Sequence, residues 1–340
     1  MGIPLVELSG SYEEVGGQHG RLLGTEIQEA LDSWGAPDRW VAGLLAATDY
    51  RSAMAEHVPE LLIELDAIAE AAGIDHDRLF AFNLLDEGWW YSREGVPPGC
   101  SVVWRPGVLS QNMDLEPWTE GHQVVLSIEP DRGPSLQVLS LPGFLGLTGL
   151  NEAGVAVCVT NLAMLRHQAV GVPVAAVIRG ILSTTTVESA VDFVRGVPHA
   201  AAQTYVIAGP STVAALEASA SGVAETPVVN EWWCHTNHPL ASADLEPTID
   251  ADSLDAAIKS SERLAILKGH RDEVPALRAV AFPRMGAVLI TFATVRYQMA
   301  EGTAEFLRMD APVTRADRPT PRLLLRRRRP PTPTRWGRRR

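Results

Sequence analysis

The sequence changes character at Val96-Pro97-Pro98-Gly99-Cys100-Ser101-Val102-Val103. There a Pro-Pro-Gly loop leads into a cysteine that opens a β-rich segment, about a third of the way along the chain. Such a position suits a nucleophile that becomes a new amino terminus once the Gly99–Cys100 bond is cut. The stretch therefore predicts a self-processing amide hydrolase or acyltransferase, with Gly99 and Cys100 as its processing site.

The residues before this loop read as mostly helical, and those after it as mostly strands. Glycines at 16, 17 and 20 weaken the start of the first helix, and Gly73 suits a helix end. Antiparallel sheets covered by helices are the expected architecture. The expected helices are 12–34, 39–56, 59–72, 172–183, 186–195 and 253–267, and the expected strands are 3–8, 101–104, 108–112, 123–128, 135–141, 155–161, 204–208, 213–218 and 223–229.

Composition fits a large globular protein in a reducing compartment. With 340 residues, 46% of them hydrophobic, the chain can bury a large core. Its three cysteines are too few for a disulfide framework. The first residues lack the basic and apolar regions of a signal peptide, and no apolar run reaches about 18 residues. We therefore expect a cytoplasmic protein with no membrane span.

The charge is unevenly distributed. Residues 313–340 hold 11 arginines and one acidic residue, a net charge of +10, so the other 312 residues carry −22. The acidic body argues against nucleic acid as a partner. The proline- and arginine-rich tail is expected to be disordered. It could be a nucleic-acid arm, but an incidental tail is the favoured interpretation.

A turn at Arg105-Pro106-Gly107 predicts a hairpin that places polar groups beside Cys100. If the turn is centred on Pro106-Gly107, residues whose numbers add to about 213 face each other. Cys100 then lies opposite Met113, with Asn112 and Asp114 on either side. Cross-strand neighbours are about 4.5–5.5 Å apart, so a thiol, an amide and a carboxylate come close together.

This cluster suits nucleophilic catalysis. Thiolate is the reactive form of cysteine, and a free α-amino group on Cys100, with a usual pKa of about 7.7–8.0, is a suitable general base. Asp114 could orient that ammonium group, and asparagine amides such as that of Asn112 could bind an oxyanion. A small buried cysteine at the start of a strand is the competing interpretation, and the commoner one.

Other candidate sites are weaker. Cys158 reads as a core residue of a strand. Near Cys234, His235 and His238 lack a third ligand of matching type, so we expect no metal site. No dinucleotide or phosphate-loop motif is present, and no cofactor is expected. The tryptophans could line an apolar pocket or belong to the core; they are residues 89, 90, 118, 232 and 233.

Six stretches in order resemble the isopenicillin N acyltransferase family (acyl-coenzyme A:6-aminopenicillanic acid acyltransferases), a branch of the N-terminal-nucleophile hydrolases. The resemblance covers about residues 3–265 and fades beyond them. The stretches are residues 8–20, residues 59–69 followed by Asn83 and Glu87, Gly99-Cys100-Ser101, Gln111-Asn112-Met113-Asp114, residues 149–154 around Asn151, and His235-Thr236-Asn237-His238.

The resemblance implies a four-layer α/β/β/α N-terminal-nucleophile hydrolase sandwich, an α+β fold preceded by a mostly helical pro-segment. It implies residues 1–99 as a small subunit that stays bound after cleavage, 100–312 as the hydrolase domain and 313–340 as the tail. Family substrates are N-acyl amides and acyl thioesters, including acyl-CoA.

The resemblance also assigns roles to site residues. Cys100 is the nucleophile and terminal-amine base, Asp114 supports charge, and Asn237 donates to the oxyanion. Asn112 and Asn151 are supporting candidates. The family's late arginine falls on either Arg263 or Arg296. Because the chain departs from the family after residue 265, a non-catalytic relative that binds acyl compounds or a partner is the alternative.

Overall fold

The computed structural model describes residues 3–282, 288–307 and 323–324. The larger sheet built from them has eight strands in the spatial order β1-β4-β5-β6-β7-β8-β9-β10. β1 is parallel to β4, and the other neighbours are antiparallel. The strands are β1 (Leu5–Gly10), β4 (Val124–Pro130), β5 (Leu136–Ser140), β6 (Thr148–Asn151), β7 (Ala156–Asn161), β8 (Gln203–Ala208), β9 (Val213–Ser219) and β10 (Gly222–Thr226).

The second sheet, counted over the same described residues, has six antiparallel strands in the order β11-β2-β3-β12-β13-β14. The hairpin that begins at the Pro-Pro-Gly loop supplies its inner strands β2 and β3. The strands are β2 (Gly99–Arg105), β3 (Val108–Leu115), β11 (Trp233–His235), β12 (Ile290–Gln298), β13 (Thr303–Leu307) and β14 (Leu323–Leu324).

Helices cover both outer faces of the sheet pair. α7 and α8 pack on β6 to β9, while α10 and α11 pack on β2, β3 and β11. Between them β2 and β3 contact β7, so the layers follow the order α/β/β/α, as expected. The helices are α1 (Tyr12–Trp34), α2 (Asp38–Ala47), α3 (Tyr50–His57), α4 (Pro59–Ala72), α5 (His76–Phe82), α6 (Leu85–Ser92), the short η1 (Pro117–Thr119), α7 (Val174–Leu182), α8 (Val187–Gly196), α9 (Ala251–Ile258), α10 (Ser260–Lys268) and α11 (Glu273–Ala279).

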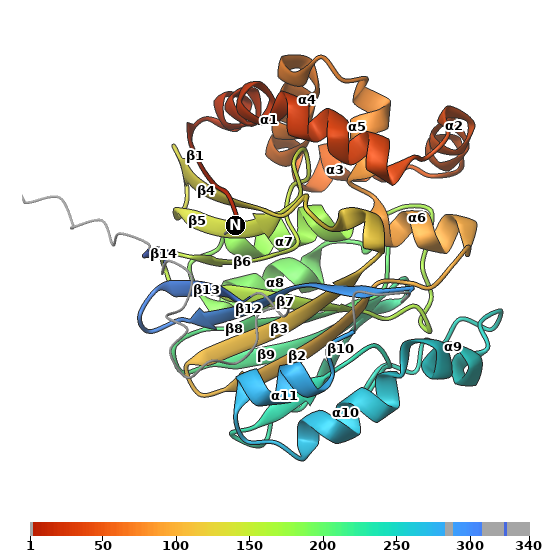
Figure 1. The fold of residues 1–340 in the computed structure, drawn as a ribbon, viewed down its shortest axis with the longest axis vertical. Helices are drawn as coiled ribbons and strands as arrows, with labels where there is room; N and C mark the ends of the chain where they lie inside the picture. The colour runs from red at the N-terminus through yellow and green to blue at the C-terminus, as the bar shows by residue number, and fades with distance from the viewer. Residues whose placement is uncertain (1–2, 283–287, 308–322, 325–340) are drawn as a thin grey trace, which may run out of the picture.

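The first 99 residues are joined to the sandwich at several places. Helices α1 to α5 gather at one end of the molecule, opposite α9 to α11, and α6 lies beside the sheets (Figure 1). β1 adds a strand to the larger sheet, and a buried ion pair joins α4 to α7. In that pair both terminal nitrogens of Arg179 lie 2.7 Å from the Glu64 carboxylate. The N-terminal part is therefore a constituent of the fold.

The glycines of α1 have a packing role that the sequence interpretation missed. The helix has the expected bounds and begins at a capping box formed by Ser11 and Glu14, so its start is well defined. A Cβ atom at Gly16 or Gly20 would overlap a carbonyl oxygen of α4. These glycines let the two helices approach closely, and the prediction of a weak helix start was wrong.

Two predicted helices are each divided in two. The helix expected at 39–56 breaks between α2 and α3 at Thr48 and Asp49. The helix expected at 253–267 breaks between α9 and α10 at Lys259, whose φ of 52° is left-handed. The helix 59–72 has its predicted bounds and ends at Gly73 with φ of 67°. The expected elements did not include helices α5, α6 and α11 or strands β6 and β11 to β14.

The predicted disordered tail, residues 313–340, lies outside the described residues except for Leu323–Leu324, which pair with β13. Among the helices of the described ranges, none is long and apolar enough to cross a membrane.

Candidate active site

The hairpin of β2 and β3 has the predicted register. Its two-residue turn is Pro106-Gly107, and Gly107 has a φ of 76°, as a type II turn requires. Cys100 pairs with Met113, and Gly99 pairs with Asp114. The local sequence therefore predicted correctly which residues stand beside the cysteine at the start of β2.

Two side chains from distant parts of the sequence hold the main chain of Cys100. Its N–H donates to Oδ1 of Asn237 at 2.9 Å, and its carbonyl oxygen accepts from Nη1 of Arg263 at 2.6 Å. The Asn237 amide nitrogen donates in turn to the carbonyl of Asn161 at 3.0 Å. Ser260 Oγ accepts from the Asn237 N–H at 2.7 Å. Both ends of the cysteine backbone are thus fixed.

Arg263 is the arginine that the structure brings to the site. It is buried on α10, and besides the Cys100 carbonyl it donates to Ser101 Oγ at 2.7 Å and to Asn237 Oδ1 at 2.6 Å. Its Nη1 lies 3.8 Å from Asp114 Oδ2. The other candidate, Arg296, instead pairs with Glu273 and Glu305. The structure therefore distinguishes two arginines that the sequence left equivalent.

Asp114 is a fully buried carboxylate directly across from Gly99. Thr291 donates to its Oδ1 at 2.6 Å, while Oδ2 has no hydrogen-bond partner among the described residues. Burial raises the pKa of Asp114 to about 6, against the opposing effects of Arg263 and Thr291. A Cβ atom at position 99 would lie 3.3 Å from the Cβ of Asp114. There is therefore little room beside Asp114 for a side chain larger than that of glycine.

The thiol of Cys100 is protonated at neutral pH in this form of the chain. Burial raises its pKa to about 12, and the Asp114 charge adds to the rise. Beside it is a cavity of about 30 Å³, lined by Met113 and Asn161 among others, which is room for a water molecule. A thiol in this state needs a local base before it can attack a carbonyl.

Three polar residues in this region were not predicted as site residues. Asp86 and Asn161 line the Cys100 cavity, and Asn161 donates to Asp86 Oδ1 at 2.7 Å. Glu87 accepts from the N–H of Val174, the first residue of α7, at 2.9 Å. Burial raises the pKa of both carboxylates, that of Glu87 to about 8 with a contribution from Asp86. The sequence feature that could have indicated Asp86 and Glu87 is the presence of two adjacent acidic residues within the otherwise apolar stretch 84–90.

The two supporting asparagines have contacts away from the cysteine. Asn112 donates to the carbonyl of Leu277 at 2.8 Å, and so ties β3 to α11. Asn151 donates to the carbonyls of Leu182 and Thr184 at the end of α7. Neither is hydrogen-bonded to Cys100 among the described contacts, and both join secondary-structure elements.

Cys158 and His235 are buried and contact residues other than Cys100. Cys158 is fully buried in β7, as predicted. His235 is buried and contacts Thr160 and Glu217, at 2.9 and 3.2 Å. Within the described part of the chain, no group of three or more potential ligands could hold a metal ion.

Two stacked sheets between helical layers, with a buried cysteine at the start of an inner strand, have the architecture of the N-terminal-nucleophile hydrolases. The sequence profile of the acyl-coenzyme A:6-aminopenicillanic acid acyl-transferase family matches residues 104–280, more than half of the chain. The chain belongs to this family, whose chemistry is acyl transfer.

Individual relatives are distant. The 40 kDa form of acyl-coenzyme A:6-aminopenicillanic-acid-acyltransferase from Emericella nidulans is 25% identical over 263 residues, 72% of this chain and 73% of that protein. An uncharacterized protein of Archaeoglobus fulgidus is 27% identical over 190 residues, 45% of this chain and 32% of that protein.

Solved structures similar to this chain include a mutant of conjugated bile acid hydrolase from Clostridium perfringens, with a TM-score of 0.43, 12% identity and coverage of 62% of this chain and 88% of that one. Penicillin V acylase from Agrobacterium tumefaciens has a TM-score of 0.36, 14% identity and coverage of 61% and 82%.

Glu87 is expected to make the uncut protein less stable as the pH rises. Because its pKa is raised from 4.5 to about 8, the folded chain holds a proton that the unfolded chain releases between those values. Stability should therefore fall, by roughly 3 kcal/mol between about pH 5.5 and 8. In a Cys100→Ala chain, Glu87→Gln should remove most of this fall in urea unfolding. Glu188→Gln, at an exposed position of α8, is the matched control, and an equal fall in all three chains would contradict the assignment.

Proposed function

We propose that the protein is a self-processing cysteine amidohydrolase or acyltransferase that is cut at Gly99–Cys100 and acts on N-acyl amides or acyl thioesters. One observation carries the proposal. Cys100 opens an inner strand with its N–H held by Asn237 and its carbonyl held by Arg263, beside the buried Asp114. A cysteine that serves only in packing does not need its main chain to be held by two polar side chains. Here both side chains come from residues more than 100 positions away in the sequence.

Processing begins with attack of the Cys100 sulfur on the carbonyl carbon of Gly99. The thiol proton passes to the departing nitrogen as the peptide C–N bond breaks, leaving a thioester and a free amine on Cys100. Water then hydrolyses the thioester, which releases the Gly99 carboxylate and restores the thiol. Asp114, directly across from Gly99, is the nearby carboxylate that would relay the proton.

Catalysis uses the new amine. With a usual pKa of about 7.7–8.0, it takes the thiol proton, and the sulfur attacks the substrate carbonyl to give an acyl-enzyme. Water or an amine then accepts the acyl group. Asn237 Oδ1 faces two donors, the Cys100 N–H and Arg263, so it would hold the amine. We assign the oxyanion donor to the amide of Asn161 in the Cys100 cavity, a revision of the role expected for Asn237.

The two pieces would stay together after the cut. Residues 1–99 supply β1 to the larger sheet and Glu64 to the buried pair with Arg179. Separation would remove an edge strand from the larger sheet and would leave Arg179 without its carboxylate partner, so both contacts favour association of the two pieces.

Intact mass and N-terminal sequencing of freshly purified protein test the proposal. We expect fragments of 99 and 241 residues, the second beginning at Cys100. Co-elution of the two fragments in gel filtration would indicate that they remain associated. A single uncut chain whose Cys100 resists iodoacetamide would contradict the proposal and favour the non-catalytic alternative.

A further inference from the structure

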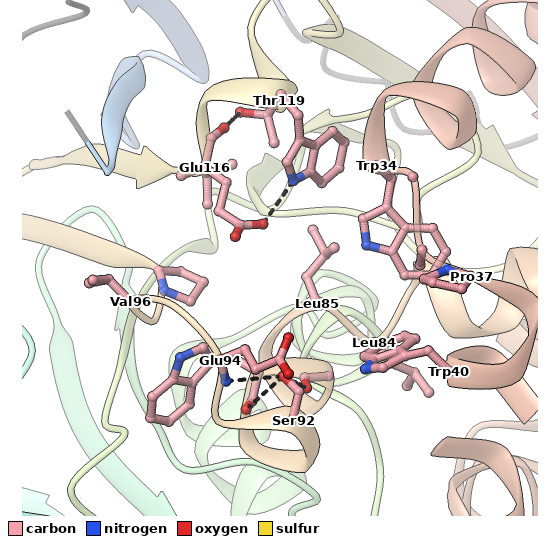
Figure 2. Close-up of a pocket in the computed structure, with 17 residues that line it drawn as sticks. Trp34, Pro37, Trp40, Leu84, Leu85, Ser92, Glu94, Val96, Glu116 and Thr119 are labelled. Carbon is pink, nitrogen blue, oxygen red and sulfur yellow. Dashed lines mark hydrogen bonds between the residues drawn. The ribbon is translucent and has the colours of Figure 1, made fainter. Parts of the chain in front are cut away.

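A larger cavity of about 290 Å³ lies beside the Cys100 cavity. Four tryptophans line it, at positions 34, 40, 89 and 118. Figure 2 shows Trp34 and Trp40 on one side of the hollow, Glu116 on a second and Glu94 on a third. The tryptophans come from α1, α2, α6 and η1, so the N-terminal helices and the hydrolase domain build the cavity together.

The two cavities share a wall. Leu85, Pro98 and Leu115 line both of them. Pro98 is two residues before Cys100, so the segment that carries the scissile bond forms part of the partition. A group bound among the tryptophans is therefore next to the space in which Cys100 would react.

The charged residues of the lining are acidic. Glu94 and Glu116 line the larger cavity at exposed positions, and Asp86 lines the smaller one; no lysine or arginine is found among the described residues lining either cavity. Trp118 Nε1 donates to Glu116 Oε2 at 2.8 Å, which fixes the carboxylate against an indole ring. Carboxylates and indole faces both attract cations, and aromatic cages are a recognised means of binding quaternary ammonium groups.

One arginine that lies over a ring of this cavity already has another partner. The Arg78 guanidinium lies 5.9 Å from the centre of the Trp34 ring, but it pairs with Asp38 and does not line the cavity. Neither Glu94 nor Glu116 belongs to an ion pair among the described residues, so their negative charge is available to a ligand.

We propose that the tryptophan cavity binds a cationic alkylammonium part of the substrate, an inference that rests on the proposed function for its connection to Cys100. The favoured substrate is then an N-acyl amide that carries a protonated or quaternary amine. An acyl-coenzyme A, with its several phosphate charges, would be repelled by this lining and by the −22 charge of residues 1–312.

Binding of three probes of one shape tests the cavity without turnover. The probes are choline, its neutral analogue 3,3-dimethyl-1-butanol and the anion 3,3-dimethylbutyrate, titrated into the full-length protein by calorimetry or tryptophan fluorescence. Choline should bind about threefold to tenfold more tightly than the alcohol, and the anion most weakly.

Glu116→Gln keeps an acceptor for the Trp118 indole but removes the charge. It should weaken choline binding about threefold to tenfold and leave the alcohol unchanged. Glu56→Gln, at an exposed position of α3 outside the cavity, is the matched control and should change neither.

The proposal is overturned if choline does not bind saturably, if the alcohol binds as tightly, or if Glu116→Gln leaves choline binding unchanged. These outcomes are separable from failure of the proposed function, which appears as an uncut chain. An uncut chain that prefers choline would retain the cation site and lose only the connection to acyl transfer. A processed chain without the preference would lose the cation site alone.

Discussion

Replacing Cys100 with alanine is expected to yield a single chain of 340 residues with no acyl-transfer activity. The substitution removes the sulfur that would attack Gly99 and, without the cut, the free amine that would serve as base. Loss of a catalytic nucleophile reduces kcat by several orders of magnitude, and we expect at least about 10³-fold here. Intact mass measures the processing, and release of the acyl group from an N-acyl amide measures the turnover.

Two further variants make this result specific. Cys234→Ala removes an equally buried thiol from the neighbouring strand β11 and should still be processed. Cys100→Ser keeps a nucleophilic atom of similar geometry and should be cut more slowly. Cleavage or acyl transfer retained by Cys100→Ala would show that the nucleophile is elsewhere.

Replacing Arg263 with methionine should destabilise the chain and slow its processing together. The change leaves the buried Asp114 without its cationic neighbour and the Cys100 carbonyl without its donor. Breaking a buried charge pair costs about 3–5 kcal/mol, measurable by urea unfolding. Since Arg263 lowers the pKa of Asp114, its removal should also move the pH dependence of processing to higher pH.

The shift in the pH dependence of processing distinguishes a role of Arg263 in positioning the reacting groups from a general loss of structure. Loss of structure alone would lower the rate without moving the pH dependence. Arg263→Lys keeps the charge but cannot reproduce the fork that reaches Cys100, Ser101 and Asn237, so processing should slow by roughly 10- to 100-fold. Arg296→Lys, in the distant cluster with Glu273, is the matched control and should process normally. Equal effects of the two lysine variants would contradict a specific role for Arg263.

The hairpin could be predicted because its determinants are local. Pro106 and Gly107 fix the turn, and counting outward from it gives the pairing of Cys100 with Met113 and of Gly99 with Asp114. Helix ends marked by glycine, as at Gly73, were equally accessible. In both cases the relevant interaction joins residues close together in the sequence.

The remainder of the site depends on contacts that no local pattern encodes. Asn237 and Arg263 reach Cys100 across 137 and 163 residues, and only the packing of α10 on β2 selects Arg263 over Arg296. Asp86 shows the same limit, because its partner Asn161 is 75 residues away. The role of Gly16 also depends on a tertiary contact. Helix propensity alone disfavours glycine there, but the absence of a Cβ atom lets α1 pack closely against α4.

The attachment of β1 to β4 has a consequence for how the protein could be recovered after unfolding. In the uncut chain, residues 93–98 join the N-terminal helices covalently to the rest of the protein, so folding is unimolecular. Once Gly99–Cys100 is broken, regaining β1 and the Glu64–Arg179 pair becomes a bimolecular association whose yield depends on concentration. The covalent connection in the uncut chain would then be needed for efficient assembly of the fold. After the cut, the protein would stay assembled because its two pieces dissociate slowly.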